Sequence, residues 1–236
     1  MDIRSLVSRV SLVRWLVAVV VMVVASAPAR AQDPVDIGVI RDEDITVVQK
    51  LLYPKNDRAE IGVHLGVMPF DTYLTTPNAQ LSYVQHLSEK FGISLLAGGG
   101  WGFKTGVYRQ LESPAFGVAP YAYRYLGSAL LGLEWSPVYA KLNWNGGRVL
   151  HFDVYVPVRV GLTVEQSVIP SGGMAFAPTA SPGIGGRFFL SRGSALKVEL
   201  RDDLLFEYRK LTSSLEFKQN ADVTVGLVFL SAAKKE

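Results

Sequence analysis

The chain has 236 residues, no cysteine and 22 glycines, and 49% of its residues are hydrophobic. The lack of cysteine excludes disulfides, a thiol nucleophile, thiolate metal sites and a lipid-modified N-terminal cysteine. Four basic residues and one acidic residue lie within residues 1–31, so the rest of the chain carries 20 charges of each sign, and a nucleic-acid partner loses the support of a net positive charge.

Residues 1–31 predict a cleaved export signal. A start with three arginines precedes the apolar run 15–24, and a small-residue A-x-A site follows at 29–31. A helix needs about 20 apolar residues to span a bilayer, whereas this order of segments is typical of a signal peptide. Residues 32–58 are then expected to form a periplasmic N-terminal segment, and the stretch from Asp44 to Tyr53 fits either a short amphipathic helix or a strand.

Eight segments in the region 59–230 alternate between apolar and polar side chains with a period of two, which is the pattern of a strand. An even number of strands is typical of single-chain outer-membrane barrels, and in lipid only a closed barrel pairs every backbone group of a sheet. We therefore predict an all-β fold over 59–230, an eight-stranded antiparallel transmembrane β-barrel of the up-and-down meander type, followed by a polar C-terminal tail at 231–236. The segments are 60–68, 79–87, 91–103, 130–144, 149–165, 182–190, 195–208 and 221–229.

The fourth segment changes phase in its middle. Its apolar residues stand at odd positions up to Trp135 and at even positions from Val138 onward. A β-bulge inserts one extra residue and shifts the alternation by one, and proline is tolerated there because it has no N–H to donate. We predict a bulge at Ser136–Pro137.

The connections also alternate in length. Those after the second, fourth and sixth segments are short, and those after the first, third, fifth and seventh are longer. Outer-membrane barrels have short periplasmic turns and longer outer loops. Both chain ends are therefore expected on the periplasmic side.

Alternation alone does not say which face is inside, because a soluble lipocalin-like barrel alternates with its apolar face inward. Three observations favour an apolar exterior: glycines gather on the polar face, aromatic residues gather near segment ends, and charges of both signs are matched on the polar face. An arginine facing lipid at mid-depth would cost about 2–4 kcal/mol. The expected interior polar network consists of Glu134, Asp153, Arg159, Arg187, Lys197, Glu199, Arg201 and Asp203.

Asp202 breaks the pattern, because it falls on the apolar face of the seventh segment. A carboxylate in lipid is costly. Two explanations stand side by side: a contact between this strand and a partner, or a second bulge at Arg201–Asp203.

Three blocks of sequence carry a family resemblance: WSPVYAK, HFDVY, and the run from RFFLS to LRDD. The chain resembles the outer-membrane β-barrel family of myxobacterial type, some members of which are linked to adventurous gliding motility. The stretch ITVVQKLLYPKNDRAEI is similar to that family's initial segment. The resemblance implies a scaffold in a trans-envelope machine and carries no catalytic motif. Phe229 is followed by seven further residues, whereas barrels of this kind often end on an aromatic residue.

No motif for cofactor, metal or catalysis emerges. The run GGGWGF lacks the Gly-Lys-Ser/Thr of a phosphate-binding loop, and His64, His86 and His151 are too dispersed for a metal site. A lipid-modifying enzyme would need a serine and a histidine near the outer rim, and nothing marks a serine partner for His64.

We expect a non-enzymatic outer-membrane barrel without cofactors, whose partners are outer-membrane lipids and other envelope proteins. The alternatives are a small-solute porin and, third, a lipid-modifying enzyme. A porin is disfavoured because side chains fill the interior of an eight-stranded barrel.

Overall fold

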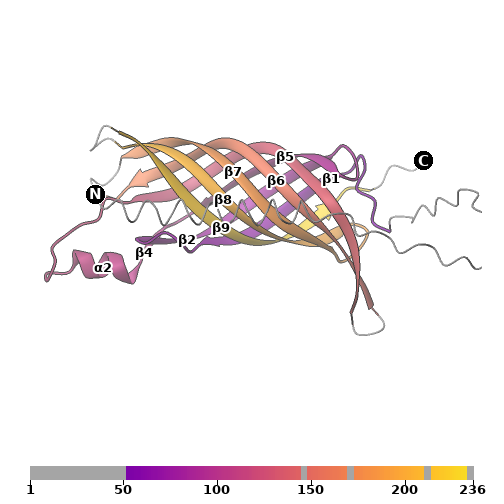
Figure 1. Cartoon of the computed structure of the whole chain (residues 1–236), viewed down its shortest axis with the longest axis horizontal. Coiled ribbons are helices and arrows are strands. Elements are labelled where there is room, and N and C mark those ends of the chain that lie inside the picture. Colours follow the sequence, from indigo (N-terminus) through magenta and orange to yellow (C-terminus); the bar gives the residue numbers. More distant parts are fainter. Residues whose placement is uncertain (1–51, 145–147, 169–172, 210–213, 233–236) are drawn as a thin grey trace, which may run out of the picture. The chain divides into compact units, whose positions relative to one another are not determined.

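The computed structural model describes residues 52–144, 148–168, 173–209 and 214–232; the predicted signal peptide, most of the segment 32–58 and the end of the tail lie outside them. Nine strands and one short helix form in these ranges (Figure 1). The elements are β1 (Ala59–Met68), β2 (Leu74–His86), β3 (Phe91–Gly100), β4 (Phe103–Lys104), α2 (Gly106–Glu112), β5 (Tyr123–Trp144), β6 (Arg148–Ser167), β7 (Met174–Phe189), β8 (Ser194–Arg209) and β9 (Ser214–Leu230).

Eight of the strands close into a ring of antiparallel neighbours. Consecutive strands pair in chain order from β1 to β9, β1 pairs with β9 at the seam, and the two-residue β4 is an addition beside β2. The structure thus confirms the predicted all-β, eight-stranded antiparallel meander. We call the rim that carries Ala59 and Leu230 the terminal rim, and the opposite rim, which carries α2, the helix rim.

The strands are staggered as well as closed. Ile61 pairs with Phe229 of β9 at the seam. If the paired residues are followed from Ile61 in the opposite direction, through β2 and then around the ring to β8, the path reaches β9 at Gln219. This residue lies ten positions from Phe229. Such a stagger accompanies a tilt of about 35–45° between strands and barrel axis.

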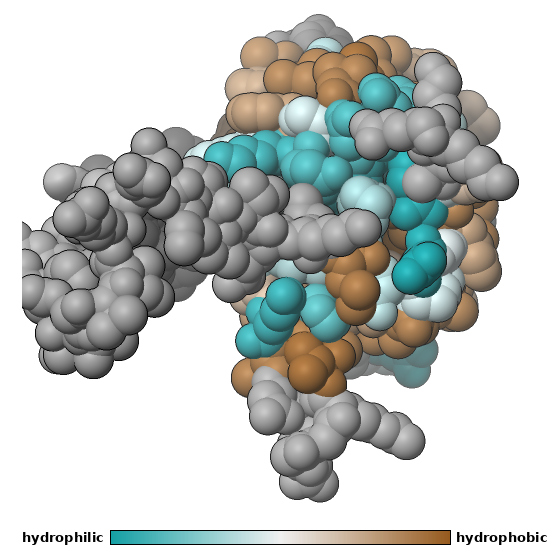
Figure 2. Space-filling model, turned by 90° about the vertical axis from the view of Figure 1, so that its right-hand side faces the viewer, coloured by the Kyte–Doolittle hydropathy of each residue, from teal (hydrophilic) through white to brown (hydrophobic). Residues whose placement is uncertain are grey.

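The apolar face is the outer one, which confirms the predicted orientation. Along β6 the outward residues include Val158, Val160 and Leu162, each more than half exposed, whereas Asp153 and Arg159 are each 1% exposed. Figure 2 looks onto the terminal rim and shows hydrophobic residues around the outside with hydrophilic residues between them. A lipocalin-like barrel with an apolar interior is therefore excluded for the described residues.

The predicted bulge in the fourth segment is confirmed. Trp135 pairs with Val156 and Val138 pairs with Val154, so Ser136 and Pro137 together oppose one residue of β6. A second register shift lies between Tyr125 and Gly127. The sequence does not indicate this shift, because it lies between the third predicted segment, 91–103, and the fourth, 130–144.

The expectation of strict short–long alternation is wrong. Only the connection from β3 to β5 is long, because most residues predicted as loops after the first, fifth and seventh segments extend β2, β7 and β9. Within that long connection lies α2, which the sequence had not indicated; Thr105 caps it, its side chain accepting a hydrogen bond from the Tyr108 N–H at 3.3 Å. Among the described residues, no helix has the length and apolar character needed to cross a membrane.

Candidate functional site: the luminal charge network and the two barrel rims

A first charge cluster lies inside the barrel near the terminal rim. Arg187 of β7 is fully buried and faces carboxylates from three other strands: its Nε lies 2.8 Å from Glu60, its Nη1 donates to Asp153 at 2.8 Å, and its Nη2 donates to Glu134. Lys197 bridges Glu60 and Glu134 at 3.0 and 2.9 Å. The barrel wall thus supplies three carboxylates against two cations here, an excess of one negative charge.

A second cluster lies deeper in the lumen. The guanidinium of Arg159 meets the Glu199 carboxylate in a bidentate pair, with Nη1–Oε1 at 2.6 Å and Nη2–Oε2 at 3.1 Å. Its Nε donates to Ser94 at 2.8 Å. Tyr155 joins the two clusters, because its hydroxyl donates to Glu199 at 3.1 Å and its ring lies 4.2 Å from Lys197 Nζ.

Arg201 holds a third group of acids. Its Nη2 lies 2.6 Å from Asp222 and its Nε 3.2 Å from Asp203. Gln80 accepts from Arg201 at 2.8 Å and donates to Asp222 at 2.8 Å. All eight residues of the expected interior network thus lie in the lumen, each at most 5% exposed, and each takes part in at least one ion pair.

Asp202 faces outward on β8, as the alternation indicated. The second bulge offered as an explanation is wrong, because β8 pairs with β9 without a register shift from Arg201 through Asp203. Its pairing with β7 keeps one register on both sides of the same position. The Asp202 Oδ1 atom is buried and has no hydrogen-bond partner among the described residues.

The terminal rim is closed by a plug segment, residues 53–58, which sequence reasoning missed. The Tyr53 ring stacks on Phe189 at 5.1 Å and meets His151 edge-on at 5.1 Å. The Lys55 ammonium, 2% exposed, donates to Asp153 and adds the cation that the first cluster lacks. Burial lowers the pKa of the Lys55 ammonium, repulsion from Arg187 lowers it further, and Asp153 opposes both effects.

Backbone contacts hold the plug segment in place. The N–H groups of Lys55 and Asn56 donate to the Glu89 carboxylate at 3.0–3.1 Å. Arg58 donates to the carbonyls of Pro54, Arg192 and Ser231 at 3.0, 2.8 and 2.6 Å. These contacts reach the β2–β3 turn, the β7–β8 turn and the residue after β9, so the plug segment joins three parts of the rim.

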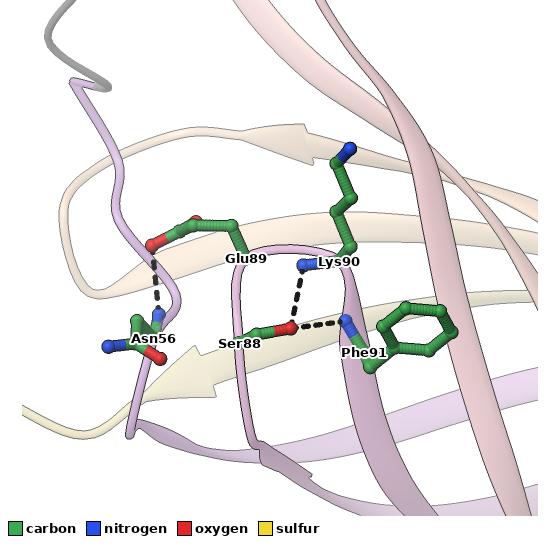
Figure 3. Close-up of a pocket in the computed structure, with 5 residues that line it drawn as sticks. All are labelled: Asn56, Ser88, Glu89, Lys90 and Phe91. Carbon is green, nitrogen blue, oxygen red and sulfur yellow. Dashed lines mark hydrogen bonds between the residues drawn. The ribbon is translucent and has the colours of Figure 1, made fainter.

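An open pocket of about 540 Å³ lies beside the plug segment and is lined by Asn56 and residues 88–91. Figure 3 shows Glu89 reaching across it to the Asn56 N–H, while Ser88 accepts hydrogen bonds from the N–H groups of Lys90 and Phe91. The Glu89 carboxylate and the Ser88 hydroxyl thus hold the turn against the plug segment. The pocket is therefore a gap beside the closure.

At the helix rim, α2 packs against the ends of the barrel strands. Tyr108 of this helix is fully buried against Leu74 and Ala122, with Tyr73 and Val168 packed beside them. The Thr105 hydroxyl donates to the Thr72 carbonyl at 2.8 Å, which fixes the helix to the β1–β2 connection. Aromatic side chains thus pack at both rims.

Near the helix rim lies an acidic group that the sequence did not single out. Lys218 of β9 lies 3.1 Å from Glu165, 3.4 Å from Glu207 and 3.8 Å from Asp71. Three carboxylates share this cation, and no group of metal-ligand type forms among the described residues. No local signal in the sequence would have found the group, because its members come from three strands and a connection.

The three histidines lie inside the barrel. His64 shares a hydrogen bond of 2.7 Å with Ser82, His86 one of 3.2 Å with Glu60, and the His151 ring contacts Tyr53. The His64–Ser82 pair, the nearest approach to the serine and histidine of a lipid-modifying enzyme, is buried inside the barrel, with each residue 5% exposed. It does not reach the outer surface where a lipid substrate would bind.

The strand pairing defines an eight-stranded antiparallel barrel, and the matches to known proteins are structural only. No protein-family model matched the chain, and a search of curated proteins found no match. The chain is similar to the solved structure of Neisserial surface protein A, with 6% identity, a TM-score of 0.46, and coverage of 73% of this chain and 94% of that one. It is also similar to OprG, an outer membrane protein from Pseudomonas aeruginosa, with 12% identity, a TM-score of 0.44, and coverage of 76% and 98%.

A third similar structure is Ail, the attachment invasion locus protein of Yersinia pestis, with 12% identity, a TM-score of 0.41, and coverage of 75% and 99%. At these identities the likeness concerns the fold alone. The chain is thus an eight-stranded antiparallel barrel similar to known outer-membrane barrel proteins.

Proposed function

We propose that the protein is a non-enzymatic integral outer-membrane barrel with a plugged lumen, acting as a structural or anchoring component of an envelope complex. The observation that carries the proposal is the combination of an apolar exterior with a lumen that ion pairs occupy and that the plug segment enters at the terminal rim. A lumen filled by side chains fits a scaffold better than a diffusion pore.

The predicted export signal orients the barrel in this proposal. With short turns on the periplasmic side, the terminal rim and the plug segment face the periplasm, and α2 faces the exterior. An envelope partner then contacts the periplasmic residues before Tyr53, the outer surface at Asp202, or the helix rim.

Fractionation and conductance test the proposal together. We expect the protein in the outer-membrane fraction with heat-modifiable gel migration, and we expect no large, stable current steps in planar bilayers. Stable steps of uniform size would contradict the plugged lumen and favour the porin alternative, while a soluble, heat-insensitive protein would contradict membrane insertion.

Partner isolation tests the anchoring role. Affinity isolation from intact, cross-linked envelopes should recover the same envelope protein with the wild-type chain and with a variant altered at an interior site. Loss of that protein with Asp202→Leu would place the contact at the outer surface of β8. Lipid A of a deletion strain should keep its acyl pattern, and an altered pattern would favour the enzyme alternative.

The resemblance to the myxobacterial-type family supports a finer role in gliding motility. Under this role, deletion of the gene slows surface movement of isolated cells, and the full-length chain restores it. Unchanged movement of isolated cells would contradict the motility role without touching the barrel assignment.

A further inference from the structure

One carboxylate of the first cluster keeps an unused oxygen. Asp153 is 1% exposed, and both of its cationic partners, Arg187 and Lys55, donate to the same oxygen, Oδ2. Oδ1 is buried and has no hydrogen-bond partner among the described residues. A buried oxygen without a partner is energetically unfavourable, which marks this position as a site that can accept a further hydrogen bond.

The strand register places a polar and aromatic surround at the same point. Tyr139 of β5 lies directly opposite Asp153 on the inner face, and its hydroxyl is also buried without a partner in the described part of the chain. Directly opposed side chains on one face lie about 4.5–5.5 Å apart at Cβ. His151 and Phe189, which oppose each other on β6 and β7, add aromatic rings on the side toward the terminal rim.

The side chain of Lys55 fills this site. Lys55 belongs to the plug segment and not to a strand of the barrel wall. The backbone of the plug segment is held without it, because Glu89 binds the Lys55 and Asn56 N–H groups and Arg58 binds three carbonyls. Truncation of the side chain at Cβ therefore leaves a cavity of its own shape, a three-carbon channel that ends at Asp153.

We propose that Asp153, Tyr139 and the rings of His151 and Phe189 form a receptor site for a primary ammonium group, which Lys55 occupies as an intramolecular ligand. An ammonium group has three N–H donors, enough for both Asp153 oxygens and the Tyr139 hydroxyl. The tethered Lys55 reaches only one of these three acceptors. A primary amine from solution, or the lysine of a partner protein, replaces Lys55 when the plug segment is displaced.

The test is chemical rescue in the full-length chain. Lys55→Ala should lower the urea midpoint of unfolding, and n-propylammonium, which reproduces the missing atoms from Cγ to Nζ, should restore it along a saturable curve. Tetramethylammonium, which has no N–H, and n-propanol, which has no charge, should not. Equal rescue by tetramethylammonium, equal rescue of Lys55→Ala/Asp153→Asn, or no rescue at all would overturn the proposal.

A second measurement uses the wild type, in case Lys55→Ala does not fold. A tethered ligand competes with a free one, so n-propylammonium should displace the Lys55 ammonium along a saturable curve and shift its Nζ resonance in NMR spectra of 15N-lysine-labelled protein. The Nζ resonance of Lys104, whose exposed pair with Glu112 lies at the helix rim, serves as the internal control. No shift at Lys55, or an equal shift at Lys104, would overturn the proposal.

The source of the amine is distinguished by ligand size. Rescue of Lys55→Ala by both n-propylammonium and Nα-acetyl-lysine methylamide would show that the mouth admits a lysine of another chain. Rescue by n-propylammonium alone would assign the site to small soluble amines.

Discussion

Arg159 and Glu199 form a two-point ion pair inside the barrel, with Nη1–Oε1 at 2.6 Å and Nη2–Oε2 at 3.1 Å. The two residues come from β6 and β8, so the pair spans the lumen past β7. Both side chains are almost fully buried. Each of the two buried charges is therefore compensated by the charge of the other residue.

Glu199→Gln should destabilise the barrel by about 3–5 kcal/mol, because it leaves the Arg159 charge buried without its carboxylate. The measurement is the urea midpoint of the protein in lipid vesicles, followed by tryptophan fluorescence. Glu112→Gln is the control, since its exposed pair with Lys104 contributes about 0–1 kcal/mol. A loss no larger than that of the control would contradict the role of the pair, and Arg159→Met added to Glu199→Gln should recover part of the loss.

Gly185→Ala should cost about 1–3 kcal/mol through overpacking. A Cβ at this position would overlap the ring of Tyr155, which is fully buried and hydrogen-bonded to Glu199. Gly106→Ala is the matched control because a Cβ there meets nothing within 4 Å. Adding Tyr155→Leu should relieve the clash, so the double variant should lose less stability than the two single variants lose together. A loss equal to that sum or larger would argue against overpacking as the cause.

Asp202→Leu and Asp203→Leu should act in opposite directions. Asp202 faces outward and one of its oxygens has no hydrogen-bond partner in the described chain, so leucine there should stabilise the barrel in pure lipid vesicles by about 1–2 kcal/mol. Asp203 pairs with Arg201 and accepts from Ser181 inside the lumen, so leucine there should destabilise it. A loss of stability with Asp202→Leu in pure lipid would mean that this carboxylate serves the barrel itself.

Arg58→Met should loosen the plug segment, because it removes three hydrogen bonds to carbonyls of different parts of the chain. Net contributions of about 1.5–3 kcal/mol for each charged hydrogen bond predict much faster amide exchange at Lys55 and Asn56. Arg192→Met is the control, since Arg192 contributes only its carbonyl to the rim contacts and its side chain is exposed. Unchanged exchange in Arg58→Met would show that Tyr53 and Glu89 suffice to hold the segment.

Period-two alternation predicted the eight strands and their orientation because one face of each strand must be apolar and the other must fit a narrow lumen. The bulge at Ser136–Pro137 was visible for the same reason: it shifts the phase of a strongly alternating segment. The second shift at Leu126 lies where small residues and a tyrosine-rich stretch blur the alternation. Strand extensions such as the start of β7, which contains Pro178, were missed because beyond the apolar belt alternation weakens while pairing continues.

The candidate site was predictable only in part. The eight interior charges follow from strand parity, but their grouping into separate clusters depends on the stagger of the strands, which single segments do not encode. Lys55 was missed because its partner Asp153 stands 98 positions away, and nothing in the local sequence marks a lysine that turns into a lumen. Tyr108 was missed in the same way, since the long connection from β3 to β5 shows no strong helical period.

The contacts of Arg187 bear on how the barrel closes during folding. Its carboxylate partners stand on β1, β5 and β6, so β1, which precedes the other strands of the ring in the chain, supplies a counter-charge to a residue of β7. Until β1 meets β9, a half-built sheet would expose that guanidinium and Lys197 without Glu60. Closure of the strand ring and neutralisation of the charges inside it thus occur in one event. This favours a single late pairing of β1 with β9 over the stepwise addition of strand pairs.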